Sequence, residues 1–197
     1  MVSGSAFLGL LALNRSGATQ AIDREMFVAL RDIHAPWFDV LGTIDDIAFR
    51  PLPTFAIAIA MSVVLAWKGP QRAWILPLGI GFTAVLEFLS KRSFSRGVHF
   101  GELIVALQGL VTGHFSGSAS FPSGHVARAT FLAVIAWWIL PRVLAIPLAI
   151  AAGMTLFARM YTESHRLSDV LGGAALGVCV GSAMIWIASS RRSRTAV

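Results

Sequence analysis

Five long apolar segments dominate the pattern of hydrophobic and polar positions along the chain. A helix that crosses a bilayer needs about 20 largely apolar residues, and each segment approaches that length. The first is the shortest, and it reaches a full span if it begins near Ile47. The pattern predicts an all-α polytopic membrane helical bundle. The five predicted spans are Leu52–Trp67, Ala73–Ser90, Ser123–Leu140, Val143–Tyr161 and Leu167–Ser190.

A shorter apolar segment, Ala6–Leu13, comes before these spans. It is too short to cross a bilayer alone. It is either the stub of a sixth span or an interfacial anchor, and the sequence leaves both open. No basic residue precedes it, so we expect no cleavable signal peptide.

Residues 14–50 follow a different pattern, in which acids alternate with apolar side chains at helical spacing. We expect amphipathic helices at the interface over Ala21–Leu30 and Pro36–Phe49. Asp45 and Asp46 resemble a metal-binding pair, but no further ligand stands nearby, so we favour a solvated helix face. The expected organisation is one membrane domain over residues 1–197, with its transmembrane core at 52–190.

Composition supports the membrane assignment. Hydrophobic residues make up 56% of the 197 residues and charged residues only 13%, whereas soluble domains have about 25% charged residues. The net charge of +6 is not clustered like a nucleic-acid-binding patch. The single cysteine, Cys179, excludes an intrachain disulfide and a cysteine metal cluster.

The distribution of basic residues predicts the orientation. The loops Lys68–Arg72 and Pro141–Arg142 and the tail after Ser190 contain six basic residues and no acids, so we place them in the cytoplasm. The outer face then holds residues 14–50, the turn around Glu163 and the long segment 91–122. Within that segment Phe100–Thr112 is too short for a span, and we expect a short interfacial helix. The outer face also carries Lys91, Arg92, Arg96, Arg159 and Arg166.

Pro122–His125 reads Pro-Ser-Gly-His, directly before a predicted helix. A helix N-terminus offers free N–H groups and a positive dipole end, which together favour an anion. The hydroxyl of Ser123 and the amide of Gly124 are suited to phosphate oxygens, and His125 can protonate a leaving oxygen near neutral pH. The alternative is a serine-capped helix with an incidental histidine.

A second constellation combines Arg159, His165 and Asp169. The histidine and the aspartate are four residues apart, which places them on one helix face. The carboxylate can hold one ring nitrogen while the other faces phosphorus, and arginine supplies a cationic fork for phosphate oxygens. The alternative is an Arg–Asp pair that closes a loop between two spans.

Together these motifs resemble those of the type 2 phosphatidic acid phosphatase family of membrane lipid phosphatases. That family has a lysine-led stretch ending in Arg-Pro, then Pro-Ser-Gly-His, then Ser-Arg, five residues, His, three residues and Asp. The second motif is complete here, and the third has Ala158 in place of the serine. In the first motif Lys91 is present, but Val98 stands where an arginine is usual. Arg96 or Arg92 is a candidate replacement.

The resemblance implies that His165 attacks phosphorus and forms a phosphohistidine, that Asp169 orients it, and that His125 protonates the leaving group. It also implies that Lys91 and Arg159 bind the phosphate, together with Ser123 and the Gly124 amide, with no metal or cofactor.

The resemblance also narrows the substrate and the location of the protein. We expect a lipid phosphate substrate in the bilayer of a bacterial inner membrane, at a site facing the periplasm or exterior. A polyprenyl (undecaprenyl-type) phosphate or diphosphate is the first expectation, and phosphatidate, phosphatidylglycerophosphate or a lipid A phosphate are alternatives. A lipid phosphotransferase and a non-enzymatic lipid-phosphate binder or transporter remain as other classes.

Two further patterns concern the spans themselves. Glu87 and Arg128 are charged within apolar segments, and we favour an ion pair between them over Arg128 as a direct phosphate ligand. In the last span Gly173, Gly177 and Gly181 recur every four residues. Such small residues let helices approach closely, and we favour packing within one chain over dimerisation.

Overall fold

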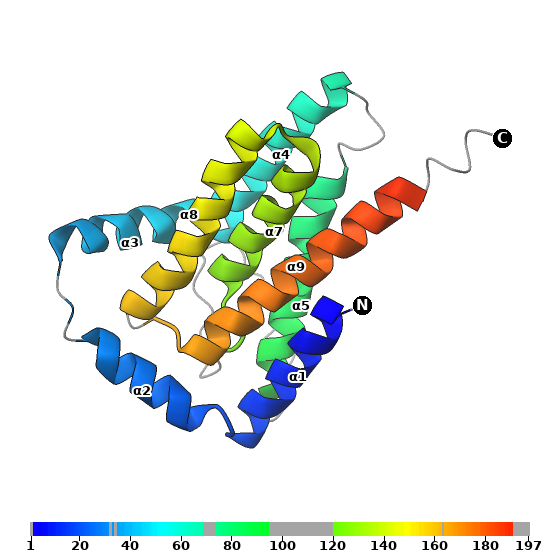
Figure 1. Cartoon of the computed structure of the whole chain (residues 1–197). Helices are drawn as coiled ribbons and strands as arrows, with labels where there is room; N and C mark the ends of the chain where they lie inside the picture. Colours follow the sequence, from blue (N-terminus) through cyan, green and yellow to red (C-terminus); the bar gives the residue numbers. More distant parts are fainter. Residues whose placement is uncertain are drawn as a thin grey trace, which may run out of the picture.

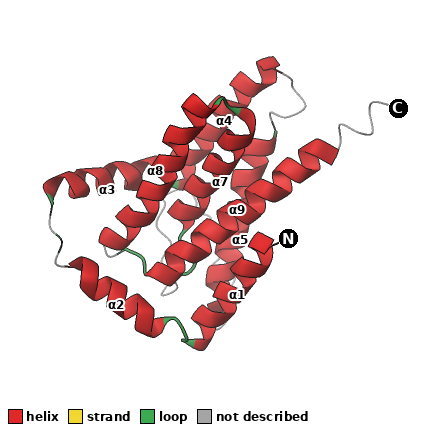
Figure 2. Ribbon diagram, in the orientation of Figure 1, coloured by secondary structure: helices red, strands yellow, loops and turns green. Residues whose placement is uncertain are grey.

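The computed structural model describes residues 2–31, 33, 35–68, 74–94, 120–162 and 164–190. Within these ranges every regular element is an α-helix (Figures 1 and 2). The helices are α1 (Val2–Ser16), α2 (Gln20–Arg31), α3 (Pro36–Ala48), α4 (Pro51–Lys68), α5 (Ile75–Phe94), α7 (Gly124–Ile139), α8 (Arg142–Tyr161) and α9 (Leu167–Ser190).

Within the described residues, each of the five apolar segments predicted as spans forms a helix: α4, α5, α7, α8 and α9. By length and hydropathy, α8 and α9 are each able to cross a membrane, and the bent pair α3 and α4 forms a third candidate among the described residues. The all-α fold is therefore confirmed, while the count of five spans stays a prediction. The expected interfacial helix Phe100–Thr112 lies outside the described residues.

Helix α7 is the centre of the bundle and packs against α5, α8 and most extensively α9 (Figure 1). The predicted glycine stripe of α9 lies in this contact. A Cβ on Gly173 would overlap the carbonyl of Ser123, and one on Gly177 would lie 2.5 Å from the carbonyl oxygen of Ala127. The glycines therefore serve packing within the chain, as we favoured.

The first three helices surround this bundle. α1 packs along α9, and a Cβ on its Gly4 would be in ordinary van der Waals contact with Sγ of Cys179. α2 contacts α8 and α9, whereas α3 contacts α8. α3 and α4 form an angle of 69° across the break before Pro51. This bend lays α3 over the end of α8 from which the site residues project (Figure 1).

We expect the variant Gly177→Ala to lower the melting temperature of the detergent-solubilised protein. The added methyl would also lie 2.9 Å from the backbone nitrogen of Phe131, and such overpacking costs about 1–3 kcal/mol. Gly153→Ala in α8 is the matched control, because its Cβ meets no atom within 4 Å. Equal melting temperatures for the two variants would contradict this account of the α7–α9 contact.

Candidate active site

The Pro-Ser-Gly-His motif forms the turn that leads into α7. The backbone N–H of Ser123 donates a hydrogen bond of 2.9 Å to the carbonyl of Asp169, which ties the start of α7 to α9. Ser123 is the N-cap residue, but its hydroxyl makes no capping hydrogen bond. That hydroxyl is fully buried and has no hydrogen-bond partner among the described residues. Because buried hydroxyls normally have a partner, it is a candidate for binding a ligand oxygen.

His165 lies in the turn between α8 and α9, and its backbone N–H donates to the carbonyl of Arg159 at 3.1 Å. Its Nδ1 is 3.7 Å from Oδ2 of Asp169, close enough for an ion pair but longer than a hydrogen bond. The same carboxylate oxygen accepts the backbone N–H of Arg166 at 2.9 Å. Asp169 thus faces one ring nitrogen of His165 and leaves Nε2 for a substrate.

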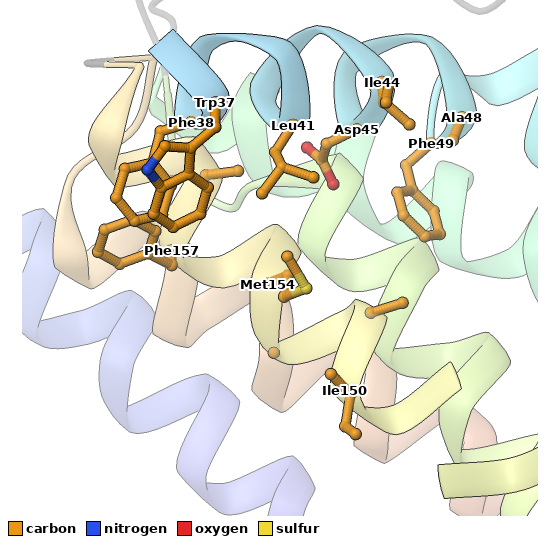
Figure 3. Close-up of a pocket in the computed structure, with 13 residues that line it drawn as sticks. Trp37, Phe38, Leu41, Ile44, Asp45, Ala48, Phe49, Ile150, Met154 and Phe157 are labelled. Atoms are coloured by element: carbon orange, nitrogen blue, oxygen red, sulfur yellow. The ribbon is translucent and has the colours of Figure 1, made fainter. Parts of the chain in front are cut away.

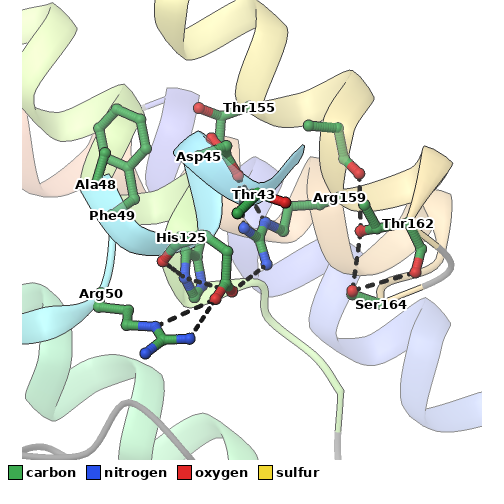
Figure 4. Close-up of polar contacts among 12 residues, drawn as sticks. Thr43, Asp45, Ala48, Phe49, Arg50, His125, Thr155, Arg159, Thr162 and Ser164 are labelled. Atoms are coloured by element: carbon green, nitrogen blue, oxygen red, sulfur yellow. Dashed lines mark hydrogen bonds and ion pairs between the residues drawn. The ribbon is translucent and has the colours of Figure 1, made fainter. Parts of the chain in front are cut away.

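Arg159 is buried and is held by the two acids of α3 (Figure 4). Its Nε donates to Oδ2 of Asp45 at 2.8 Å, and its Nη2 lies 2.7 Å from the same oxygen. Its Nη1 donates to Oδ1 of Asp46 at 3.1 Å. Our interpretation of this acid pair as a solvated helix face was wrong, because the bend between α3 and α4 turns both carboxylates toward the site and Asp45 is only 8% exposed.

His125 points toward the same acids from the first turn of α7 (Figure 4). Its Nε2 lies 3.2 Å from the backbone carbonyl oxygen of Asp46 and 3.6 Å from the Oδ1 atom of that residue. Arg50 also binds the Asp46 carboxylate, with its Nε at 3.2 Å. The Asp46 carboxylate therefore bridges Arg159, which we expect to bind a phosphate, and His125, which we expect to protonate the leaving group.

A buried ion-pair network lies beside the Pro-Ser-Gly-His turn. Oε1 of Glu87 accepts from Lys91 at 2.7 Å and Oε2 accepts from Nη1 of Arg128 at 2.8 Å. Nε of Arg128 donates to the carbonyl of Phe49, at the break between α3 and α4. A Cβ on Gly124 would overlap the Glu87 carboxylate, so glycine is required there. The structure contains the Glu87–Arg128 pair that we favoured.

The candidates for the altered first motif have different environments. The guanidinium of Arg92 lies 5.5 Å from the ring centroid of Phe88, a cation–π distance. Arg96 and Val98 lie outside the described residues, as does Glu163.

Sequence reasoning missed a second group of polar residues, which fixes the N-terminus of α9. Asp23 of α2 accepts hydrogen bonds of 2.8 Å from both the backbone N–H and the hydroxyl of Ser168. The same hydroxyl accepts from Asn14 at 2.8 Å. Asp23 is buried and precedes Ser168 by 145 residues, so no local spacing reveals the contact.

An apolar groove of about 650 Å³ opens between α3 and α8, next to the ion pair of Arg159 and Asp45 (Figure 3). Two of its lining residues are next to Arg159: Asp45 binds its guanidinium, and Ala158 precedes it in the chain. The remaining lining residues are Trp37, Phe38, Leu41, Ile44, Ala48, Phe49, Ile150, Ala151, Gly153, Met154 and Phe157. Within the described residues no group of three or more His, Cys, Asp or Glu side chains is arranged to hold a metal ion.

The model of the PAP2 superfamily matches residues 72–193, which include every motif residue described above. The chain belongs to this superfamily. Its fold is similar to the crystal structure of a transmembrane PAP2-type phosphatidylglycerolphosphate phosphatase from Bacillus subtilis. That match has a TM-score of 0.73 and 23% identity, and it covers 96% of this chain and 95% of the other. No curated protein sequence gave a match.

We expect Arg128→Met to destabilise the protein, because it removes one partner of the buried Glu87 carboxylate. Breaking a buried pair costs about 3–5 kcal/mol, and the double variant Glu87→Gln/Arg128→Met should recover part of that loss. Melting temperatures in detergent test this, with the exposed Arg142→Met as control. A wild-type melting temperature with a strongly raised KM would instead make Arg128 a phosphate ligand.

Proposed function

We propose that this membrane lipid phosphatase hydrolyses a polyprenyl phosphate or diphosphate through a phosphohistidine intermediate. One observation carries the proposal: helices α7, α8 and α9, with the turns before α7 and α9, bring five groups together at one end of the bundle. These are His125, His165, Asp169, Arg159 and the Ser123 hydroxyl, which has no hydrogen-bond partner among the described residues.

In the first step Nε2 of His165 attacks the terminal phosphorus, and the bond from that phosphorus to the leaving oxygen breaks. The leaving oxygen is the lipid alcohol oxygen of a monophosphate or the bridging oxygen of a diphosphate. Asp169 stabilises the positive charge that develops on the ring, as the aspartate of a catalytic triad does. His125 donates its proton to the leaving oxygen. The guanidinium of Arg159 and the hydroxyl of Ser123 bind the phosphoryl oxygens, where negative charge accumulates.

In the second step a water molecule attacks the phosphohistidine. His125, now neutral, takes a proton from this water while the bond between phosphorus and His165 breaks. Inorganic phosphate leaves and both histidines return to their starting protonation states. Because the cationic side chains of the site supply the required charge stabilisation, we propose that the reaction needs no metal ion.

The groove between α3 and α8 supports a substrate with long hydrocarbon chains. Its volume is in the range of small-molecule binding pockets, about 300–1,000 Å³, and its otherwise apolar lining includes Asp45, which binds Arg159. A lipid whose tail lies in this groove would present its phosphate to the site. In the orientation expected from the basic loops, this end of the bundle faces the outside of a bacterial inner membrane.

Replacement of His165 by alanine should reduce lipid-phosphate hydrolysis at least a thousandfold, because the nucleophile is lost. His125→Ala should slow hydrolysis by about 10²–10⁴-fold. With p-nitrophenyl phosphate, whose leaving group needs no proton, His125→Ala should accumulate acid-labile phosphoprotein.

The measurement is a phosphate-release assay on the purified protein in the presence of EDTA. The substrates are a polyprenyl phosphate or diphosphate, phosphatidate and phosphatidylglycerophosphate. Full activity of His165→Ala would exclude it as the nucleophile, and dependence on added Mg²⁺ would contradict the metal-free scheme. Preference for a diacylglycerol-based phosphate would replace the polyprenyl assignment.

A bulky residue in the groove should select against long lipids. We expect Met154→Trp to raise KM for a long-chain lipid phosphate much more than for a short soluble phosphate ester, because the indole occupies the space of the tail. Leu148→Trp is the matched control, since this residue is also partly exposed on α8 but does not line the groove. Equal KM values for the two variants on the long-chain lipid would exclude the groove as the tail site.

A further inference from the structure

Asp46 occupies the position that a substrate phosphate would need. Its Oδ1 is 3.1 Å from Nη1 of Arg159 and 3.6 Å from Nε2 of His125. In the proposed reaction these nitrogens contact the phosphoryl oxygens and the leaving oxygen. A carboxylate and a phosphate compete for the same donors, because both are oxygen anions.

We propose that Asp46 is an internal anion that keeps weakly bound phosphodiesters out of the site, because the phosphate of any ligand must displace it from Arg159 and His125. The inference rests on the proposed phosphatase site and goes beyond it. It assigns a function to a carboxylate that takes no part in the chemical steps.

Asp45 has a different function, although it precedes Asp46 in the same helix. It binds the Nε and Nη2 side of the guanidinium and is nearly buried. This contact orients Arg159 and leaves Nη1 directed at the site. Asp45 is therefore a positioning residue, whereas Asp46, whose side chain is 37% exposed, lies on the accessible side.

Arg50 provides a second partner for Asp46 once the phosphate arrives. It lies one helical turn later and already contacts Oδ2, the other oxygen of the carboxylate. A rotation of the side chain away from Arg159 thus keeps one ion pair intact. Displacement then costs less than leaving a carboxylate unpaired.

The anions that compete with Asp46 for the site differ in charge. A bilayer presents phosphodiester headgroups, which carry a single negative charge on phosphate, in large excess over phosphate monoesters and diphosphates. A phosphate monoester at neutral pH carries close to two charges and gains more from a cationic site than a phosphodiester does. A resident carboxylate raises the apparent dissociation constants of both anions by the same factor. The phosphodiester, which binds more weakly, then no longer fills the site, whereas the phosphate monoester still binds.

Titration calorimetry of the full-length protein with inorganic phosphate tests the proposal without requiring turnover. We expect Asp46→Asn to tighten phosphate binding about three- to fivefold, because an ion pair that competes with the ligand is lost. Asp45→Asn should weaken binding, since Arg159 loses its orientation. The matched control is Asp39→Asn, an exposed acid of α3 that bonds Tyr161 and contacts neither Arg159 nor His125.

A second measurement addresses selectivity. Phosphatidylglycerol in mixed micelles should inhibit lipid-phosphate hydrolysis by Asp46→Asn more strongly than hydrolysis by the wild type. Unchanged or weaker phosphate binding by Asp46→Asn, or equal inhibition of both proteins, would overturn the proposal. A protein that binds phosphate as expected but hydrolyses no lipid would instead refute the phosphatase function and leave the competition intact.

Discussion

The close approach of α7 and α9 is the constraint on which the rest of the structure depends. Glycines on α9 bring its backbone against that of α7, and the same contact lets the amide of Ser123 bond to the carbonyl of Asp169. Two motifs that are more than 30 residues apart in the sequence thereby become neighbours. A larger residue at Gly173 would separate the helix that carries His125 from the helix that carries Asp169.

Buried charges impose a second constraint, because each needs a partner within a low-dielectric bundle. Glu87 is the partner of Arg128, and Asp45 is the partner of Arg159. Both pairs join helices distant in sequence, and Arg128 also bonds the carbonyl of Phe49 at the bend before α4. The pairs therefore hold α3 over the site while they compensate the charges.

The sequence predicted the local features well and the long-range polar contacts poorly. The apolar period predicted the bounds of α9, Leu167–Ser190, to the residue. The prediction that His165 and Asp169 share one helix face was wrong, because α9 begins only at Leu167 and His165 lies in the turn before it, although its Nδ1 is still 3.7 Å from Oδ2 of Asp169. The positions of Asp45 and Asp46 depend instead on a bend near Pro51, whose direction no periodicity encodes. An acid on an amphipathic helix has the same pattern whether it faces water or an arginine of another helix.

Charge balance at the site argues for anion exchange. Lys91 and Arg159, cations expected to bind phosphate, each contact a carboxylate in this structure, and Arg128 does so as well. A phosphate that enters such a site replaces existing ion pairs. The net free energy of binding is therefore the difference between the interaction of the site with phosphate and its interaction with the carboxylate that leaves. The buried pairs of Glu87 and Asp45 cannot be exchanged cheaply, because the displaced carboxylate would remain buried without a partner. Asp46 is partly exposed and is already bonded to Arg50, so its carboxylate can leave Arg159 with a smaller loss of free energy.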